Sequence, residues 1–310
     1  MNHFREFGLV CIAALILSIP TSGLVVFDES SGFHIEPSFQ DLTLQPTDLT
    51  GEYDLELVNH TLKPVTYELS VQDLTDLPDL VGRTMPGTVS RDFTDPAYTL
   101  SQWVTLSQSA VTLNPGEKTA VTVTVSNDDQ LSAGGHYAAI IASGSEVGRS
   151  TQETTAVSVQ PILDSLLFVR KLGNERYGLI VQALTFKRRF LNIPTSVTIH
   201  FRNTGNTHLV PRGRLRIVDP LGRVVSDGVI NVSSATLLPS SERAYAVSLN
   251  PVNRVWLPGW YRINVDYRHD LETDFHSFQD SVFVSSLVSL SVLTLIAELT
   301  VWIVIRRRRA

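Results

Sequence analysis

Cysteine is nearly absent from this chain of 310 residues: the only one, Cys11, lies in an apolar run near the N-terminus. A disulfide framework and a thiolate zinc site are therefore both excluded from the body of the protein. Charged residues make up only 18% of the chain, whereas 43% of residues are hydrophobic. This composition excludes a disordered chain, and the length suits one large domain or two ordinary ones.

Long stretches with the apolar periodicity of a helix are also missing between the two ends of the chain. Short runs of alternating or β-branched residues take their place, separated by Gly, Pro, Asn and Asp. Alternation of this kind is typical of half-buried strands, and many short strands between turns indicate a β-sandwich. The predicted strands include Tyr53–Val58, Val65–Val71, Ala120–Val125, Ala138–Ala142, Val197–Phe201, Arg214–Val218, Ala244–Leu249 and Tyr261–Tyr267.

The pattern repeats along the chain. Pro115 and Tyr137 recur 124 residues later as Pro239 and Tyr261, each pair in a similar context of turn and strand. Asn59 recurs as Asn203, 144 residues later, so the first unit holds about 20 extra residues, which we assign to an insertion over Asp73–Thr99. We expect the two tyrosines to be packed rings with bonded hydroxyls near a loop-to-strand corner.

The fold predicted from these patterns is all-β, with two tandem immunoglobulin-like β-sandwiches followed by one C-terminal transmembrane helix. Residues 24–160 form the first sandwich and 161–280 the second. Residues 1–23 resemble a signal peptide, with an uncleaved anchor as the alternative. Residues 281–305 contain a single charge, Glu298, and precede four arginines in the tail 306–310, as expected of a membrane span with a cytoplasmic tail.

Catalytic motifs are absent from the sequence. We find no nucleophile elbow, no paired metal-binding histidines at helical spacing, no phosphate loop and no dinucleotide-binding glycines. We therefore predict no catalytic residue, no metal ligand and no cofactor, and expect a protein that is not an enzyme. A carbohydrate-active enzyme that uses carboxylates of the first unit is the least favoured alternative.

Charge divides at the predicted domain boundary. Residues 24–160 carry 5 basic and 19 acidic side chains, a net of −14, whereas 161–280 carry 15 and 10, a net of +5. The candidate binding residues for an anionic surface are the alternating Arg212, Arg214 and Arg216 and the cluster Lys187, Arg188 and Arg189. A solvated strand face and a charged loop are the alternative. Nucleic acid is not an expected partner of an exported protein.

The order of these parts resembles that of a known family. The relevant motifs are Gly32–Pro37, Asn114–Glu117 and Gly134–Tyr137 in the first unit, Asn203–Asn206 and Pro211–Gly213 in the second, and the terminal arginines. Together they are similar to the WxL-interacting proteins of Gram-positive cell surfaces. That resemblance implies a peptidoglycan-binding domain, a host-binding domain and a C-terminal membrane anchor.

The leading functional hypothesis is a non-enzymatic cell-surface protein, embedded in the membrane by one helix, with its ectodomain outside and its C-terminus in the cytoplasm. Its expected partners are peptidoglycan or another anionic wall polymer, secreted surface proteins of the WxL type, or both. The alternative is an accessory subunit of a membrane assembly or sensing complex. In that case Glu298 would pair the helix with a basic residue of another helix.

Overall fold

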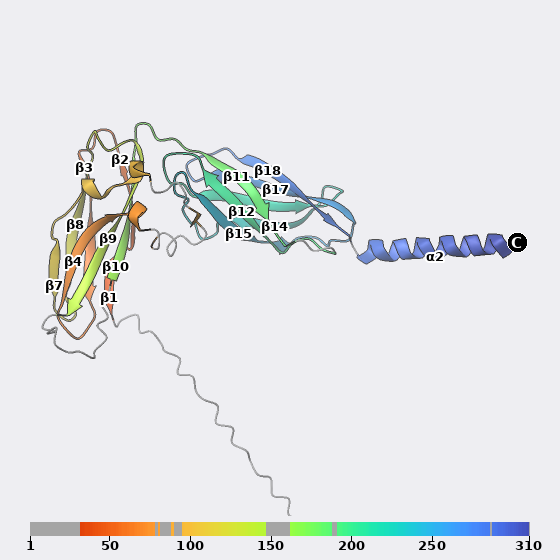
Figure 1. Ribbon diagram of the computed structural model, residues 1–310, viewed down its shortest axis with the longest axis horizontal. Coiled ribbons are helices and arrows are strands. Elements are labelled where there is room, and N and C mark those ends of the chain that lie inside the picture. Colours follow the sequence, from red (N-terminus) through yellow and green to blue (C-terminus); the bar gives the residue numbers. More distant parts are fainter. Residues whose placement is uncertain are drawn as a thin grey trace, which may run out of the picture.

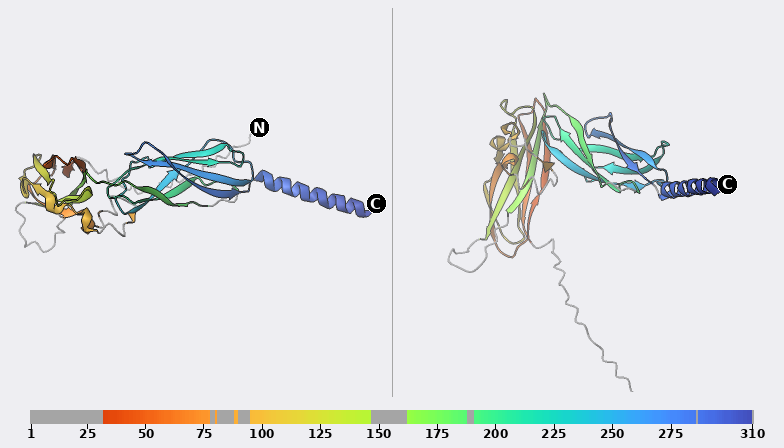
Figure 2. Two further views of the ribbon diagram at one scale, coloured as in Figure 1. Left: turned by 90° about the horizontal axis from the view of Figure 1, so that it is seen from above. Right: turned by 45° about the vertical axis from the view of Figure 1, so that its right-hand side comes forward.

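The computed structural model describes residues 32–77, 80, 88–89, 95–146, 162–187, 191–285 and 287–309. Two β-sandwiches meet at an elbow, and a helix extends from the far end of the second sandwich (Figures 1 and 2). The predicted fold class is thus confirmed for its two immunoglobulin-like sandwiches. The predicted signal peptide, residues 1–23, lies outside the described residues.

The first sandwich packs a four-stranded sheet on a five-stranded one. In spatial order, the smaller sheet contains β1 (Phe33–Glu36), β3 (Thr50–Asn59), β8 (Lys118–Ser126) and β6 (Val104–Leu106). The larger sheet contains β2 (Phe39–Leu44), β10 (Ile162–Lys171), β9 (Gly134–Glu146), β4 (Val65–Asp73) and β7 (Ala110–Leu113). The core between the sheets is built from inward residues such as Leu55, Val123 and Ile140.

The second sandwich repeats this division into four and five strands. Its smaller sheet contains β11 (Leu179–Thr185), β12 (Ser196–Asn203), β15 (Glu242–Ser248) and β5 (Thr88–Val89). Its larger sheet contains β16 (Asn250–Pro251), β14 (Val224–Ile230), β13 (Pro211–Val218), β17 (Gly259–His269) and β18 (His276–Val284). Each predicted strand coincides with an observed one, apart from Leu249, which lies just outside β15.

The internal repeat extends to hydrogen bonds. Asn59 is buried, and its side-chain amide donates to the carbonyl oxygens of Lys63 and Leu113. Asn203 is equally buried and donates to those of Thr207 and Leu237, which stand at the same offsets of 144 and 124 residues. In both units the amide satisfies carbonyl groups that would otherwise be buried without a partner. The two sandwiches thus close equivalent hairpins with the same pair of asparagine hydrogen bonds.

The first sandwich extends past the predicted boundary at 160/161. β10 pairs along its whole length with β9 and runs parallel to β2, so the linker between the domains begins after Lys171. Both faces of β10 are covered: Leu167 and Val169 belong to the core, whereas Leu166 and Phe168 face the insertion. A strand buried on both faces loses the alternation on which the prediction relied.

The insertion between β4 and β6 connects the two domains. Its Leu74, Leu80 and Tyr98 pack with Tyr137 on the outer face of the first domain, and Leu238 of the second domain joins the same apolar cluster. Two residues of the insertion form β5, which pairs antiparallel with the first two residues of β15. The elbow is therefore a packed interface with its own small core.

A polar network surrounds this core. The buried ring of His208, in the second domain, faces Asp41 at 3.2 Å, Arg170 at 3.0 Å and the Tyr137 hydroxyl at 3.2 Å, all in the first domain. Asn206 accepts a bond from the backbone of Gly135 and donates one from its side chain to Ala133. Tyr261 behaves as predicted, since its buried hydroxyl donates to Leu257. Tyr137 contributes more than predicted, because it joins the two domains.

His136 makes the stability of the first domain dependent on pH. Its buried ring lies within hydrogen-bond distance of the carbonyl oxygens of Ser132 and Thr99, and burial lowers its pKa. The unfolded chain therefore takes up the proton at a higher pH than the folded one, and this contribution to stability is lost as the pH falls below about 6.5. One such group changes the unfolding free energy by at most about 1.4 kcal/mol per pH unit.

We expect the difference in unfolding free energy between wild type and His136→Gln to shrink between pH 7.5 and pH 5.5. Urea titrations of both proteins at the two pH values measure this difference. A constant difference would show that His136 does not titrate differently on folding.

Helix α2 covers Leu287–Arg309 and differs from the predicted transmembrane helix over residues 281–305. Residues 281–284 are the last of β18, where Val282 and Phe283 pair with Tyr261 and Trp260. The helix instead continues through the arginines. No helix in the described part of the chain is both long and apolar enough to be a membrane span. The predicted transmembrane helix, and with it the embedding in a membrane, is not supported.

Candidate functional site

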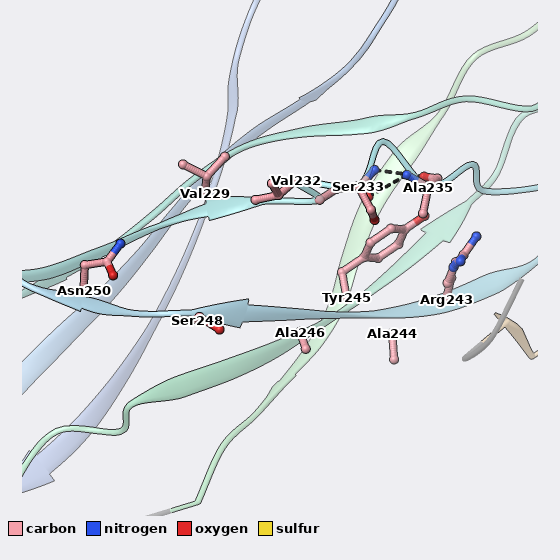
Figure 3. Close-up of a pocket in the computed structure, with 11 residues that line it drawn as sticks. Val229, Val232, Ser233, Ala235, Arg243, Ala244, Tyr245, Ala246, Ser248 and Asn250 are labelled. Atoms are coloured by element: carbon pink, nitrogen blue, oxygen red, sulfur yellow. Dashed lines mark hydrogen bonds between the residues drawn. The ribbon is translucent and has the colours of Figure 1, made fainter. Parts of the chain in front are cut away.

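A groove runs along the open side of the second sandwich, between the edges of its two sheets (Figure 3). It has a volume of about 590 Å³. One wall is β15, and the other is the end of β14 with the loop that follows it. The lining residues are Val229, Asn231, Val232, Ser233, Ala235, Arg243, Ala244, Tyr245, Ala246, Ser248 and Asn250.

The wall formed by β15 presents unpaired backbone groups. The bonds from Asn203 N to Ser241 O and from Leu249 N to Thr195 O, both 3.0 Å, show that the odd-numbered residues of this segment face β12. The N–H and C=O groups of the even-numbered residues therefore point to the opposite edge. There Glu242 pairs with β5, whereas Ala244, Ala246 and Ser248 have no backbone partner in the described part of the chain.

This edge lacks the features that usually protect exposed strands. In natural proteins, charged side chains, prolines, bulges or a short length usually keep an edge strand from pairing with another chain. Of the other edges of this domain, β11 carries a bulge and β16 consists of two residues, one of them Pro251. The open part of β15 presents only Ala244, Ala246 and Ser248 to the outside, with neither charge nor proline.

The opposite wall is held rigid by Asn231. Its backbone has a positive φ of 54°, and its side chain donates to Pro211 O and Ala235 O while accepting from Ala235 N. Two apolar side chains of this wall face solvent: Val229, near the end of β14, is 57% exposed, and Val232, in the turn, is 80% exposed. The wall is thus preformed and apolar.

Tyr245 forms the floor of the groove. Its ring packs edge-on against Phe201, and its hydroxyl donates to Ala235 O at 3.2 Å. Burial raises the Tyr245 pKa, so the phenol stays neutral at ordinary pH. Arg243, the only charged lining residue, is 7% exposed, lies 5.5 Å from the Tyr245 ring centre and donates to Thr236 O. The groove therefore offers apolar contacts and backbone hydrogen bonds rather than charge.

The groove narrows to a closed end at Gly228. A side chain there would come within 2.6 Å of Ser248 O and 2.7 Å of Val247, so the two edges nearly touch. At the other end, β5 occupies the edge beside Arg243. Among the described residues, Ala244–Ala246 therefore lie between the part of β15 that pairs with β5 and the part that Gly228 covers.

The lining consists of apolar, hydroxyl and amide side chains and one arginine. It contains no pair of carboxylates and no histidine or cysteine beside Ser233 or Ser248. No group of three or more metal-ligating side chains was found in the described part of the chain. The sequence predicted the strand Ala244–Leu249 but not the groove, because alternation shows which residues are buried and not which strand ends a sheet.

The three predicted arginines do share one face, and each forms a hydrogen bond or an ion pair within the protein. Arg212, Arg214 and Arg216 lie on the outer face of β13, as alternation required. Arg212 donates to the Ser234 hydroxyl, Arg214 pairs with Asp227 at 2.9 Å, and Arg216 pairs with Asp266 at 2.5 Å. Both aspartates come from neighbouring strands. Binding of an anionic surface by these arginines stays a prediction.

Of the other predicted site residues, Lys187 and Glu298 make no contact with this face in the described part of the chain. Lys187 follows β11, whereas Arg188 and Arg189 lie outside the described residues. Glu298 is exposed on α2 and has no partner in the described part of the chain. Its proposed pairing with another helix also stays a prediction.

Comparison with known proteins gives similarities of fold only. No family model matches the chain, and no curated protein matches it. The class 5 fimbriae chaperone CfaA is 12% identical and has a TM-score of 0.41, with 83% of this chain and all of that chain covered. A chain of a chaperone–tip adhesin complex of CFA/I fimbriae biogenesis is 10% identical and has a TM-score of 0.42, with 81% of this chain and 98% of that chain covered. A chain in the structure of the Salmonella enterica SafA pilin with the SafB chaperone is 9% identical and has a TM-score of 0.37, with 81% of this chain and 96% of that chain covered. Similarities this distant assign the chain to no family.

Proposed function

We propose that this protein is a non-enzymatic binding protein whose second domain holds a segment of another polypeptide in the groove beside β15. The observation that carries the proposal is an apolar groove whose rim includes Ala244 and Ala246, two residues whose outward backbone groups have no partner in the described part of the chain. Backbone donors and acceptors are matched best by another backbone, and Val229 and Val232 offer apolar contacts beside them. A charged polymer would find little exposed charge there, because Arg243, the only charged lining residue, is 7% exposed and donates to Thr236 O.

The rigid elbow supports the same proposal. Because the insertion, Tyr137 and His208 fix the second domain against the first, the groove has a constant position relative to the first domain. A preformed site loses little conformational entropy on binding. The protein would thus hold its partner at a set distance from the acidic first domain.

Two finer points of this function are proposals of the same kind. Membership of the WxL-interacting family, with a location at the cell surface, would make the partner a secreted surface protein. Binding of an anionic wall polymer by Arg212, Arg214 and Arg216 is the second candidate, because all three share one face. It is the weaker candidate, since Asp227 and Asp266 already neutralise two of the arginines.

Site-specific photocrosslinking tests the proposed function. A photoreactive benzoylphenylalanine replaces Val232 at the groove, or Leu221, an equally apolar side chain that is 71% exposed in the turn between β13 and β14. In cells that produce the protein, we expect a discrete crosslinked polypeptide from position 232 and none from position 221.

The variant Val229→Asp provides the control for specificity. Burial of one valine contributes about 1.5 kcal/mol or more, so its loss should reduce crosslinking at position 232 about tenfold. Equal products from positions 221 and 232, or crosslinking that Val229→Asp leaves unchanged, would contradict the proposed site.

A further inference from the structure

We propose that the end of the second domain from which α2 leaves rests on an anionic phospholipid surface, with its exposed aromatic side chains at the level of the head groups. This inference goes beyond the proposed polypeptide partner and does not depend on it. Four features support it: the apolar patch at this end, its rigid frame, the arginines around it, and its continuity with α2.

Apolar side chains gather where three segments meet at this end. The segments are the turn between β13 and β14, the loop between β16 and β17, and the adjoining ends of β17 and β18. Arg223 of the turn lies over the Trp256 ring of the loop at 5.4 Å, and Trp260 of β17 contacts Phe283 of β18 edge-on at a centroid distance of 5.5 Å. The exposed members of this end patch are Leu221, Val252, Trp256, Trp260 and Phe283, each between 48% and 71% exposed.

Hydrogen bonds hold the turn and the loop in place. The buried carboxylate of Asp219 accepts bonds from the backbone N–H of Leu221 and from the backbone and side chain of Arg223. The side chain of Asn253 donates to Val224 O, which fixes the loop to the start of β14. The end patch is therefore preformed, and little conformational entropy is lost when a surface covers it.

Positive charge surrounds the end patch. Arg254 and Arg262 are exposed and form no ion pair with any described residue. Asp219, the only acidic residue in the turn 219–223 and the loop 252–258, is buried and already paired with Arg223. Tryptophan and arginine combine an apolar body with a polar tip, which suits them to the boundary between lipid and water. The arginines are also attracted to anionic head groups.

The opposite end of the same hairpin differs in charge. The turn between β17 and β18 also exposes apolar side chains, Leu271 and Phe275, and Arg268 lies over the Phe275 ring at 5.4 Å. The same turn, however, carries the acidic residues Asp270, Glu272 and Asp274. Anionic lipid would repel this turn, so it provides a matched control for the end patch.

Helix α2 continues the apolar surface of this end (Figures 1 and 2). Its residues Val301–Ile305 are five consecutive apolar residues, and all five are exposed. Consecutive residues of a helix point to different sides, so a protein packed against one side would leave most of them in water. A fluid apolar phase covers them all, which favours lipid over protein beside the end patch. Contact of the domain end with the lipid–water boundary requires no helix that crosses a membrane.

A fluorophore at position 221 tests the contact. In the full chain with Cys11→Ser, bimane is attached at Leu221→Cys or, for comparison, at Leu271→Cys. The vesicles contain equal parts of phosphatidylcholine and phosphatidylglycerol, with a nitroxide-bearing phospholipid as the quencher. We expect quenching of bimane at position 221 and none at position 271.

Substitutions in the end patch measure its contribution. With Trp256→Ser and Trp260→Ser together, the lipid concentration that gives half of the maximal quenching at position 221 should rise at least about tenfold. With Phe275→Ser, the matched control, it should not change. Vesicles of phosphatidylcholine alone should also quench position 221 more weakly, because they offer the arginines no net negative charge.

Three outcomes would overturn lipid contact: no quenching at position 221, equal quenching at positions 221 and 271, or a half-point that the double substitution leaves unchanged. The first two need no substitution in the patch beyond the label, so they decide even if the double variant fails to fold. Absence of quenching together with a polypeptide crosslinked from benzoylphenylalanine at position 256 would assign this end to a protein partner. Crosslinking at Val232 is measured separately, so either proposal can fail alone.

Discussion

Replacing Gly213 by alanine should destabilise the second domain by about 3 kcal/mol. β13 passes so close to β17 at this point that the new Cβ would lie 2.2 Å from the carbonyl oxygen of Asp266 and 2.9 Å from the Cα of Tyr267. Both atoms belong to the backbone of a strand bonded on its two sides, so neither can move without breaking the ladder.

Urea unfolding of the variant, followed by far-ultraviolet circular dichroism, measures the loss. The control is Gly32→Ala, where a Cβ would meet no atom within 4 Å. We expect the control to unfold as wild type does. A Gly213→Ala protein with the wild-type midpoint would mean that the two strands can separate at no cost.

Replacing Tyr137 by alanine should lower the free energy of unfolding by about 3–5 kcal/mol. It should also allow the two domains to move relative to each other. The ring is fully buried, contacts Phe168 at a centroid distance of 4.8 Å and carries the hydroxyl that reaches His208. Its removal leaves a cavity between the insertion and the second domain. The fixed orientation of the domains should then give way to a range of orientations.

Tyr67→Ala separates the two effects. Tyr67 is as deeply buried as Tyr137, but it lies in the core of the first sandwich, away from the elbow. Small-angle X-ray scattering should show a wider distribution of interatomic distances for Tyr137→Ala and an unchanged one for Tyr67→Ala. An equal change in both variants would show that Tyr137 acts only through the stability of its own domain.

The strands could be predicted because a strand that is buried on one face alternates between apolar and polar residues in sequence. Ala120–Val125 alternates, and β8 does bury Val121, Val123 and Val125. The same period placed Arg212, Arg214 and Arg216 on one face. Their partners Asp227 and Asp266 could not be predicted, because they come from neighbouring strands whose register depends on the whole sheet.

The groove could not be predicted for a related reason. Whether β15 ends a sheet depends on the order of strands in space, and here that order includes β5, which comes from the other domain. The prediction of the domain boundary was wrong because β10 is buried on both faces. The run Leu166–Val169 is apolar throughout, so it shows no alternation that would assign it to the first sandwich. The elbow depends on Tyr137 and His208, which are 71 residues apart in sequence.

The pairing of β5 with β15 has a consequence for how this chain can be divided. A cut in the linker after Lys171 would not by itself free the second domain, because Thr88 and Val89 would still hold it by the edge. A fragment that begins at the linker would lack β5, and the start of β15 at Glu242 and Arg243 would be uncovered as well. Such fragments would tend to pair with one another through that strand. The insertion therefore covers the start of an edge that would otherwise be open to pairing with another chain.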